Sequence, residues 1–445
     1  MNKKNQFIIM IQVILIGGLA KMMSLLTKII MTRELGLEAM SLFSLVNPLI
    51  LLLLTLSSLS LQNAIGSLIS KNPEKKIHIL KSALIITIVI SVFLMISLLI
   101  LSRFISNYLF NNPNIYPSII ASIFIIPLTS ISSIIKGYFL GIGELKLSSF
   151  SQIFEECGRL LFLIIILTLL SNLDSSIKSS IAIFSLCVGE IFQITYLLVF
   201  YKNTNFSKFK RFFQIKTISE NYYSDILKIS IPMTLSRLVG SLTYFLEPII
   251  FTMIMGSLGF DNNTIAIHYG ILNSYALPLL LLPGFISLTL SNLLIPNLGK
   301  NIRLNNYNAC YKYLLKITFI CFLIGLSISI FFYFTSDYLT TLIYGQNYGS
   351  NIIKKYSFFF VIYYIETPLI TAMTIFNLNK KAFSSTVISS ICRILLMFYF
   401  IPIYKIDGLC ISIIVSTYVD VFLNIIHLLI FFKRNNIVTF FFNKQ

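Results

Sequence analysis

The sequence has few charged residues. Of its 445 residues, 11% are charged and 56% are hydrophobic, whereas about 25% of the residues of soluble domains are charged. So few charges cannot cover the surface of a soluble protein of this size. The composition therefore excludes an ordinary soluble fold and indicates a protein that contacts lipid over much of its surface.

The sequence also lacks the patterns that carry most enzyme chemistry. It has no Ser/His/Asp set, HExxH motif, phosphate-binding glycine-rich loop or metal-ligand spacing. Its six cysteines form no CxxC pair and no cluster with the three histidines, so we expect packing residues and no disulfide, metal or other cofactor. No nucleic-acid-binding motif accompanies the net charge of +18, which is typical of cytoplasmic loops that face anionic lipid.

Long apolar runs fill most of the chain. Each is about 20 residues or longer, the length that an α-helix needs to cross a bilayer. The runs are continuous rather than alternating, which excludes a membrane β-barrel. The sequence therefore predicts an all-α polytopic membrane protein with about twelve transmembrane helices. We expect the spans near 7–30, 42–69, 79–101, 117–139, 150–170, 180–201, 224–255, 267–296, 313–336, 356–378, 384–404 and 408–432.

The distribution of lysine and arginine predicts the orientation. If the N-terminus is cytoplasmic, the inside segments and adjoining span ends hold 20 of these residues and the outside segments hold 6. Cytoplasmic loops carry this excess in most membrane proteins. We therefore expect both termini in the cytoplasm.

The longest polar interruption, 202–223, divides the spans into six and six. Because six is even, both halves start from the same side of the membrane, as parallel repeats do. The prediction is an N-terminal six-helix bundle at 1–201, a basic cytoplasmic linker at 202–223 and a C-terminal six-helix bundle at 224–445.

Several basic residues lie inside the predicted spans. A charge at the bilayer centre costs about 2.5–3.5 kcal/mol even on lenient scales, so such residues line wet cavities or pair with one another. A shared central cavity lined by cations would suit an anionic headgroup such as a pyrophosphate. The candidate headgroup-binding residues are Lys21, Lys28, Arg159 and Arg237.

Acidic residues lie inside the spans as well. Glu155 and Arg159 are four residues apart, the spacing of a helical ion pair, and such a pair could serve packing alone. Glu247 has no partner at helical spacing and is expected to face the cavity. The candidate residues for charge pairing or coupling are Glu155, Glu247, Glu366 and Asp420.

Short motifs are distributed along the whole chain. They are Ile229–Thr234, Arg237, Ser241, Glu247, Tyr269–Leu272, Ala276–Leu279, Leu294–Pro296, Thr32–Gly36, Asn47–Pro48, Ser151–Gln152, Glu155, Arg159 and Ile406–Gly408. Together they resemble the motifs of stage V sporulation protein B and related polysaccharide exporters, and the segment 229–296 carries the most specific part of this resemblance.

This resemblance implies the multidrug/oligosaccharidyl-lipid/polysaccharide exporter superfamily. Its members have two six-helix bundles around a central cavity and work by alternating access, and its lipid II flippases have a cationic cavity. The chain departs from the pattern at Lys21 and Lys28, where relatives usually carry arginine. Lysine keeps the charge but loses the bidentate fork.

The expected function is therefore that of a flippase in the bacterial cytoplasmic membrane. It would move a lipid-linked cell-wall or polysaccharide precursor, such as a lipid II-like polyprenyl-pyrophosphate sugar, and could act as a monomer. A sporulation or peptidoglycan role is compatible with this reading. Two alternatives stay open: a cation-coupled multidrug exporter of the same fold, and a membrane-embedded glycosyltransferase or polymerase, although the predicted outer loops are short and poor in acids.

Overall fold

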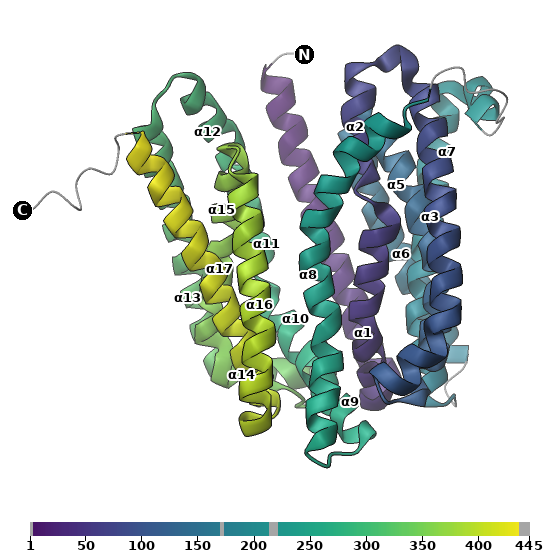
Figure 1. The fold of residues 1–445 in the computed structure, drawn as a ribbon, viewed down its shortest axis with the longest axis vertical. Helices are drawn as coiled ribbons and strands as arrows, with labels where there is room; N and C mark the ends of the chain where they lie inside the picture. Colours follow the sequence, from purple (N-terminus) through teal and green to yellow (C-terminus); the bar gives the residue numbers. More distant parts are fainter. Residues whose placement is uncertain (1–2, 170–172, 213–220, 436–445) are drawn as a thin grey trace, which may run out of the picture. The chain divides into compact units, whose positions relative to one another are not determined.

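The computed structural model describes residues 3–169, 173–212 and 221–435. Within these ranges the chain forms helices and no β-strand, which confirms the predicted all-α fold (Figure 1). The α-helices of the first part are α1 (Lys3–Ser58), α2 (Leu61–Lys71), α3 (Lys76–Phe104), α4 (Tyr116–Ile123), α5 (Ile125–Gly141), α6 (Leu145–Leu169), α7 (Ser175–Phe212), α8 (Tyr223–Ser257) and α9 (Asn262–Gly270). Those of the second part are α10 (Leu277–Leu281), α11 (Gly284–Asn292), α12 (Leu294–Arg303), α13 (Tyr307–Tyr344), α14 (Ser350–Tyr356), α15 (Val361–Ile375), α16 (Asn379–Tyr404) and α17 (Ile406–Arg434).

The helices account for the predicted spans. Ten helical segments of the described chain are long and apolar enough to cross a membrane. The first, Leu15–Lys71, is 57 residues long; it contains the predicted span 42–69 and most of the predicted span 7–30. Helix α6 is also long, but Glu155, Glu156 and Arg159 occur in every 18-residue window of it, which lowers its apolar character. The chain is a multi-pass integral membrane protein.

Helix α1 contains two membrane segments joined at Gly36. This residue has φ 77° and ψ 174°, a conformation outside the helical region that glycine adopts without the strain of a side chain. The first residues of α1 and helix α2 lie at the same end in Figure 1, so the chain reverses between them. Gly36 therefore separates the first predicted span from the second.

The chain divides into two compact units. Unit 1 comprises Met1–Thr252 and Asn262–Gly270, and unit 2 comprises Met253–Asp261 and Ile271–Gln445. Most of α8 belongs to unit 1, where Phe245 packs edge-on against Phe110. The predicted linker boundary at 202–223 remains a prediction, and residues 213–220 of it lie outside the described residues.

Each unit has its own apolar core. In unit 1, helices α2, α3 and α5 supply most of the core, with Ile65, Ala83 and Ile134 nearly inaccessible. In unit 2, the core is made by α12, α13, α15 and α17. Since lipid is as apolar as leucine, these cores are held by close packing rather than by exclusion of water.

Glycines bring α2 and α5 of unit 1 into close contact. A Cβ atom placed on Gly137 would lie 3.0 Å from the Gln62 carbonyl oxygen and 3.0 Å from the Ile65 Cβ. A Cβ atom on Gly141, one turn later, would lie 2.7 Å from the Ile69 Cβ. Small residues spaced four apart allow this approach of two helices in a membrane.

We expect Gly137→Val to destabilise the protein, because the branched side chain would meet the α2 backbone. Overpacking of this kind costs about 1–3 kcal/mol. Thermal unfolding in detergent, followed by size-exclusion chromatography, measures the effect. Gly299→Ala is the control, since a Cβ atom there meets nothing within 4 Å. Equal stability of the two variants would contradict the proposed helix contact.

Candidate functional site

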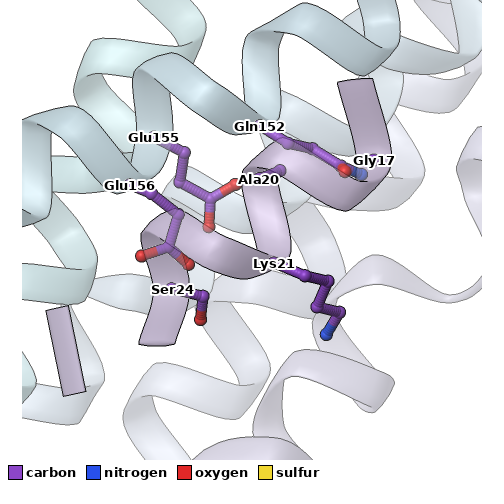
Figure 2. Close-up of a pocket in the computed structure, with 7 residues that line it drawn as sticks. All are labelled: Gly17, Ala20, Lys21, Ser24, Gln152, Glu155 and Glu156. Atoms are coloured by element: carbon purple, nitrogen blue, oxygen red, sulfur yellow. The ribbon is translucent and has the colours of Figure 1, made fainter. Parts of the chain in front are cut away.

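A pocket of about 250 Å³ lies between α1 and α6 in unit 1 (Figure 2). Helix α1 presents residues at positions i, i+3, i+4 and i+7, and α6 presents residues at i, i+3 and i+4, so each helix contributes one face. Gly17 and Ala20 leave space because their side chains are small. The lining residues are Gly17, Ala20, Lys21, Ser24, Gln152, Glu155 and Glu156.

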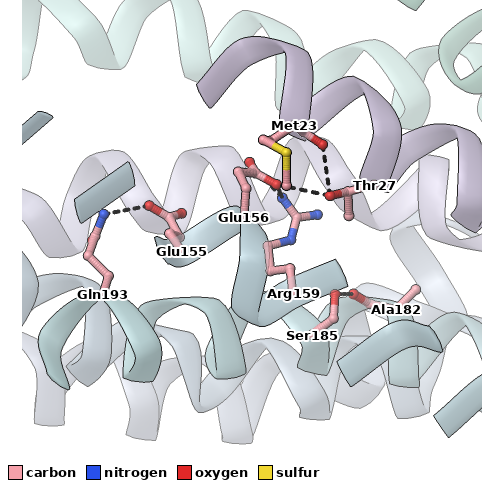
Figure 3. Close-up of polar contacts among 8 residues, drawn as sticks. All are labelled: Met23, Thr27, Glu155, Glu156, Arg159, Ala182, Ser185 and Gln193. Carbon is pink, nitrogen blue, oxygen red and sulfur yellow. Dashed lines mark hydrogen bonds and ion pairs between the residues drawn. The ribbon is translucent and has the colours of Figure 1, made fainter. Parts of the chain in front are cut away.

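Arg159 is held by Glu156 beside this pocket. The Arg159 Nη1 atom lies 3.3 Å from both Glu156 carboxylate oxygens, and the Thr27 hydroxyl of α1 donates to Glu156 Oε2 at 3.3 Å (Figure 3). The prediction that Arg159 pairs with Glu155 is wrong. Residues three and four apart are both neighbours on a helix, and Glu155 has a different partner.

That partner is Gln193 of α7, which is fully buried. Its Nε2 atom donates to Glu155 Oε2 at 2.7 Å, and the Ser132 hydroxyl of α5 donates to its Oε1 atom at 2.8 Å. The bond from Ser132 orients the amide. Figure 3 shows the Gln193 nitrogen facing the Glu155 carboxylate. Glu155 is therefore held by a neutral donor, and its negative charge is not cancelled by this bond.

Glycine makes this contact between α6 and α7 possible. A Cβ atom on Gly189 of α7 would lie 2.6 Å from Arg159 Cγ and 2.9 Å from the Glu155 carbonyl oxygen. Any larger residue at this position would push the two helices apart. The close approach brings Gln193, one turn further along α7, within hydrogen-bonding distance of Glu155.

More charged groups surround the pocket. Lys28 lies close enough to Arg159 to interact with it electrostatically, and Lys136 and Glu190 are close enough to act on Glu155. Glu190 is 8% exposed, and its Oε2 atom has no hydrogen-bond partner in the described residues. The structure thus gathers Lys28, Arg159 and Glu155 around the α1–α6 contact.

Lys21 differs from these residues. It is exposed and makes no hydrogen bond or ion pair with any residue that the structure describes. In Figure 2 its side chain extends away from the two carboxylates. Of the predicted cations, Lys21 alone lines the pocket; Arg237 is exposed on α8 and does not line it.

The remaining predicted acids lie elsewhere. Glu247 is 1% exposed in α8, and the Tyr269 hydroxyl donates to its Oε1 atom at 3.4 Å. In unit 2, Glu366 lies close enough to Asp420 and Arg393 to interact with both electrostatically. Whether Glu247, Glu366 and Asp420 take part in coupling remains a prediction.

Asp420 has neutral hydrogen-bond donors. The Asn424 amide donates to its Oδ2 atom at 3.0 Å, and the Ser389 hydroxyl donates to its Oδ1 atom at 3.4 Å. The described residues contain no group of three or more His, Cys, Asp or Glu side chains that could hold a metal ion, and all six cysteines are free.

Sequence reasoning missed the neutral members of the site. Thr27, Ser132 and Gln193 lie in apolar spans. Nothing in the sequence distinguishes Thr27 and Ser132 from the many other uncharged polar residues in these spans. Gln193 alone had a local signal, because it is three residues after Glu190 and shares its helix face. Lys136 also lies inside a span, and its position near Glu155 depends on how α5 packs against α6.

Comparisons with known proteins agree with this architecture. The family model described as polysaccharide biosynthesis protein matches residues 8–302. The chain is 26% identical to stage V sporulation protein B of Bacillus subtilis (strain 168) over 389 residues, which is 86% of this chain and 75% of that protein. It is 23% identical to sporulation protein YkvU of the same strain over 386 residues, covering 85% of this chain and 84% of that protein.

Solved structures share the fold. A multidrug resistance MATE family transporter of the MOP superfamily, in an inward-facing conformation, has a TM-score of 0.72 at 14% identity, covering 97% of this chain and 99% of that chain. The lipid II flippase MurJ, in an inward closed conformation, also has a TM-score of 0.72 at 14% identity, covering 94% and 87%. The predicted transporter fold is confirmed.

We predict a strong coupling free energy of unfolding between Glu156 and Arg159, because the two side chains form an ion pair. The side chains are each 13% exposed, so the loss of one partner leaves a charge with little water around it. We expect Glu156→Gln and Arg159→Gln each to lower the thermal midpoint, and the double variant to lower it by less than their sum, with a coupling of about 2 kcal/mol.

Lys355 and Asp407 provide the matched control. Their ion pair is 2.6 Å long, but the side chains are 58% and 34% exposed. The same cycle with Lys355→Ala and Asp407→Asn should give a coupling below about 1 kcal/mol. Additive effects of the Glu156 and Arg159 substitutions would show that the pair does not stabilise the fold.

Proposed function

Because the chain belongs to the polysaccharide biosynthesis protein family, we propose that it is a flippase for a lipid-linked precursor. Its substrate would be a polyprenyl-pyrophosphate sugar of the cell wall or of a polysaccharide. The lipid tail would stay in the bilayer while the headgroup crosses by alternating access. The setting is the bacterial cytoplasmic membrane, with both termini in the cytoplasm.

The observation that carries the proposal is the state of Lys21. It lies within a membrane-crossing segment, lines a pocket, and has no partner among the described residues. An uncompensated ammonium group is costly in lipid, so it is retained where water or an anionic ligand reaches it. A pyrophosphate accepts charge-assisted hydrogen bonds from such a group, which fits a lipid-linked precursor.

The alternating-access transport cycle needs a source of free energy, and two sources are candidates. A positively charged site that moves across the membrane field gains about 2.3 kcal/mol per charge per 100 mV, so the membrane potential can bias the two states. Protonation of Glu155 or Glu247 is the competing route. A ligand drives the change only through different affinities for the two states.

A cation-coupled multidrug exporter is the second candidate. The fold likeness to the MATE transporter equals that to the lipid II flippase in TM-score, and the Glu155 carboxylate lines the pocket without an ion-pair partner among the described residues, which suits a small cationic ligand. The family match favours the polysaccharide precursor. Efflux of a cationic dye separates the two functions, because a flippase for an anionic headgroup leaves the dye in the cell.

Depletion of the protein should cause its substrate to accumulate in the cytoplasmic leaflet. The lipid-linked sugars of depleted cells are extracted and identified by mass spectrometry, and their side of the membrane is assigned with an impermeant glycan-modifying reagent. We expect one polyprenyl-pyrophosphate sugar to rise. An unchanged profile of lipid-linked sugars together with loss of dye efflux would support the exporter instead.

Replacing the predicted headgroup-binding cations tests the proposed headgroup contacts. Lys21→Ala removes charge-assisted hydrogen bonds of about 1.5–3 kcal/mol, so we expect the transport rate of reconstituted protein to fall about tenfold or more. Lys21→Arg should keep most of the rate because it keeps the charge. Arg237→Ala is expected to act in the same direction.

Lys228→Ala is the control for Arg237→Ala, because both residues are exposed on α8 and Lys228 lies near the helix start. Its rate should match that of the unchanged protein at equal protein level. If Lys21→Ala or Arg237→Ala also leaves the rate unchanged, that residue has no part in headgroup binding.

A further inference from the structure

The pocket presents separated charges rather than a uniform cationic surface. Lys21 and Glu155 line the same space. Within the described part of the chain they form no ion pair with each other. Glu156 is occupied by Arg159 and Thr27. The groups left to meet a ligand are therefore one ammonium group and one carboxylate that no cation neutralises by direct contact.

Glu155 is also positioned for contact with a ligand. Gln193 holds its Oε2 atom, and Oε1 receives no hydrogen bond from the residues that the structure describes. Since Ser132 fixes the Gln193 amide, the carboxylate is oriented before a ligand arrives, which reduces the entropy cost of binding. Gln152 lines the pocket beside it and has no partner in the described ranges.

The size of the pocket limits what it can hold. Its volume of about 250 Å³ is below the range of about 300–1,000 Å³ that holds drug-sized ligands. A sugar ring with its phosphate fits such a space better than an oligosaccharide does. The pocket would then contact the lipid-proximal sugar and leave the rest of the glycan outside.

We infer that this pocket selects the charge of the lipid-proximal sugar. Lys21 binds the phosphate, and Glu155 with Gln152 receives hydrogen bonds from hydroxyl or amine groups on the ring. A sugar that carries its own carboxylate is rejected, because Glu155 would lie against a like charge. The substrate class is therefore a precursor whose first sugar is neutral or amine-bearing, rather than a uronic acid. The inference rests on the proposed function and narrows it.

The test uses the full-length protein in detergent micelles and three polyprenyl-pyrophosphate probes. One carries glucose, one carries glucuronic acid, which differs only in the carboxylate at C6, and one carries no sugar. Displacement of a fluorescent probe lipid gives the affinities. We expect the glucose probe to bind about tenfold more tightly than the glucuronic acid probe.

Glu155→Gln should abolish most of this preference, because it removes the charge but keeps an oxygen that can accept from Gln193. The affinity for the glucuronic acid probe should rise towards that for the glucose probe. Lys21→Ala should weaken all three probes by a similar factor. Glu74→Gln is the control for the loss of a carboxylate, since Glu74 is exposed and outside the pocket.

If Glu155→Gln does not fold, a second variant tests whether Glu155 causes the preference for the glucose probe. Ser132→Ala keeps the charge of Glu155 but frees the Gln193 amide that holds its carboxylate. The carboxylate can then turn away from the sugar, so the preference should fall without a change in the binding of the probe that carries no sugar. Unchanged preference in the variant that folds would overturn the inference.

The outcomes separate the inference from the proposed function. If the unchanged protein binds all three probes with equal affinity, the charge selection is wrong and the flippase proposal stands. If it binds none of them, the flippase proposal fails and the selection fails with it. A preference for the glucuronic acid probe would also overturn the inference.

Discussion

Charged side chains within the bilayer impose the constraint on which this structure depends. Each must find a partner, a neutral donor or water, because the hydrocarbon offers none of these. Arg159 and Glu156 meet the requirement as an ion pair that Thr27 extends to α1. Glu155 meets it through a chain of neutral groups from α5 and α7. The polar contacts therefore tie α1, α5, α6 and α7 of unit 1 together.

Small residues make these polar contacts possible. Gly189 lets α7 approach Arg159 and Glu155, and Gly17 and Ala20 leave the space that becomes the pocket. In lipid, where apolar burial does not drive helices together, close packing and hydrogen bonds supply the association. The same features thus hold the unit together and shape the space in which Lys21 and Glu155 meet a ligand.

Most of the fold was predictable from the sequence. A helix that crosses a bilayer needs a long apolar run, and each predicted span coincides with helical segments of the structure. Predicting the site was harder. Lys21, Lys28, Arg159 and Glu155 all lie in long helices, as the predicted spans require. The ion pair of Arg159 forms with Glu156 instead of Glu155. Residues three and four apart are both close on a helix, and the choice depends on what α7 supplies to Glu155.

The sequence by itself determined that this is a multi-pass helical membrane protein with charges inside its spans, because the length and polarity of each run are local properties. Tertiary structure decided which of those charges are neutralised and which are left to a ligand. Gln193 reaches Glu155 only because α6 and α7 touch at Gly189, and Lys21 stays unpaired among the described residues because no acidic oxygen lies within ion-pair distance of it. Such contacts join residues far apart in the chain, so no local pattern encodes them.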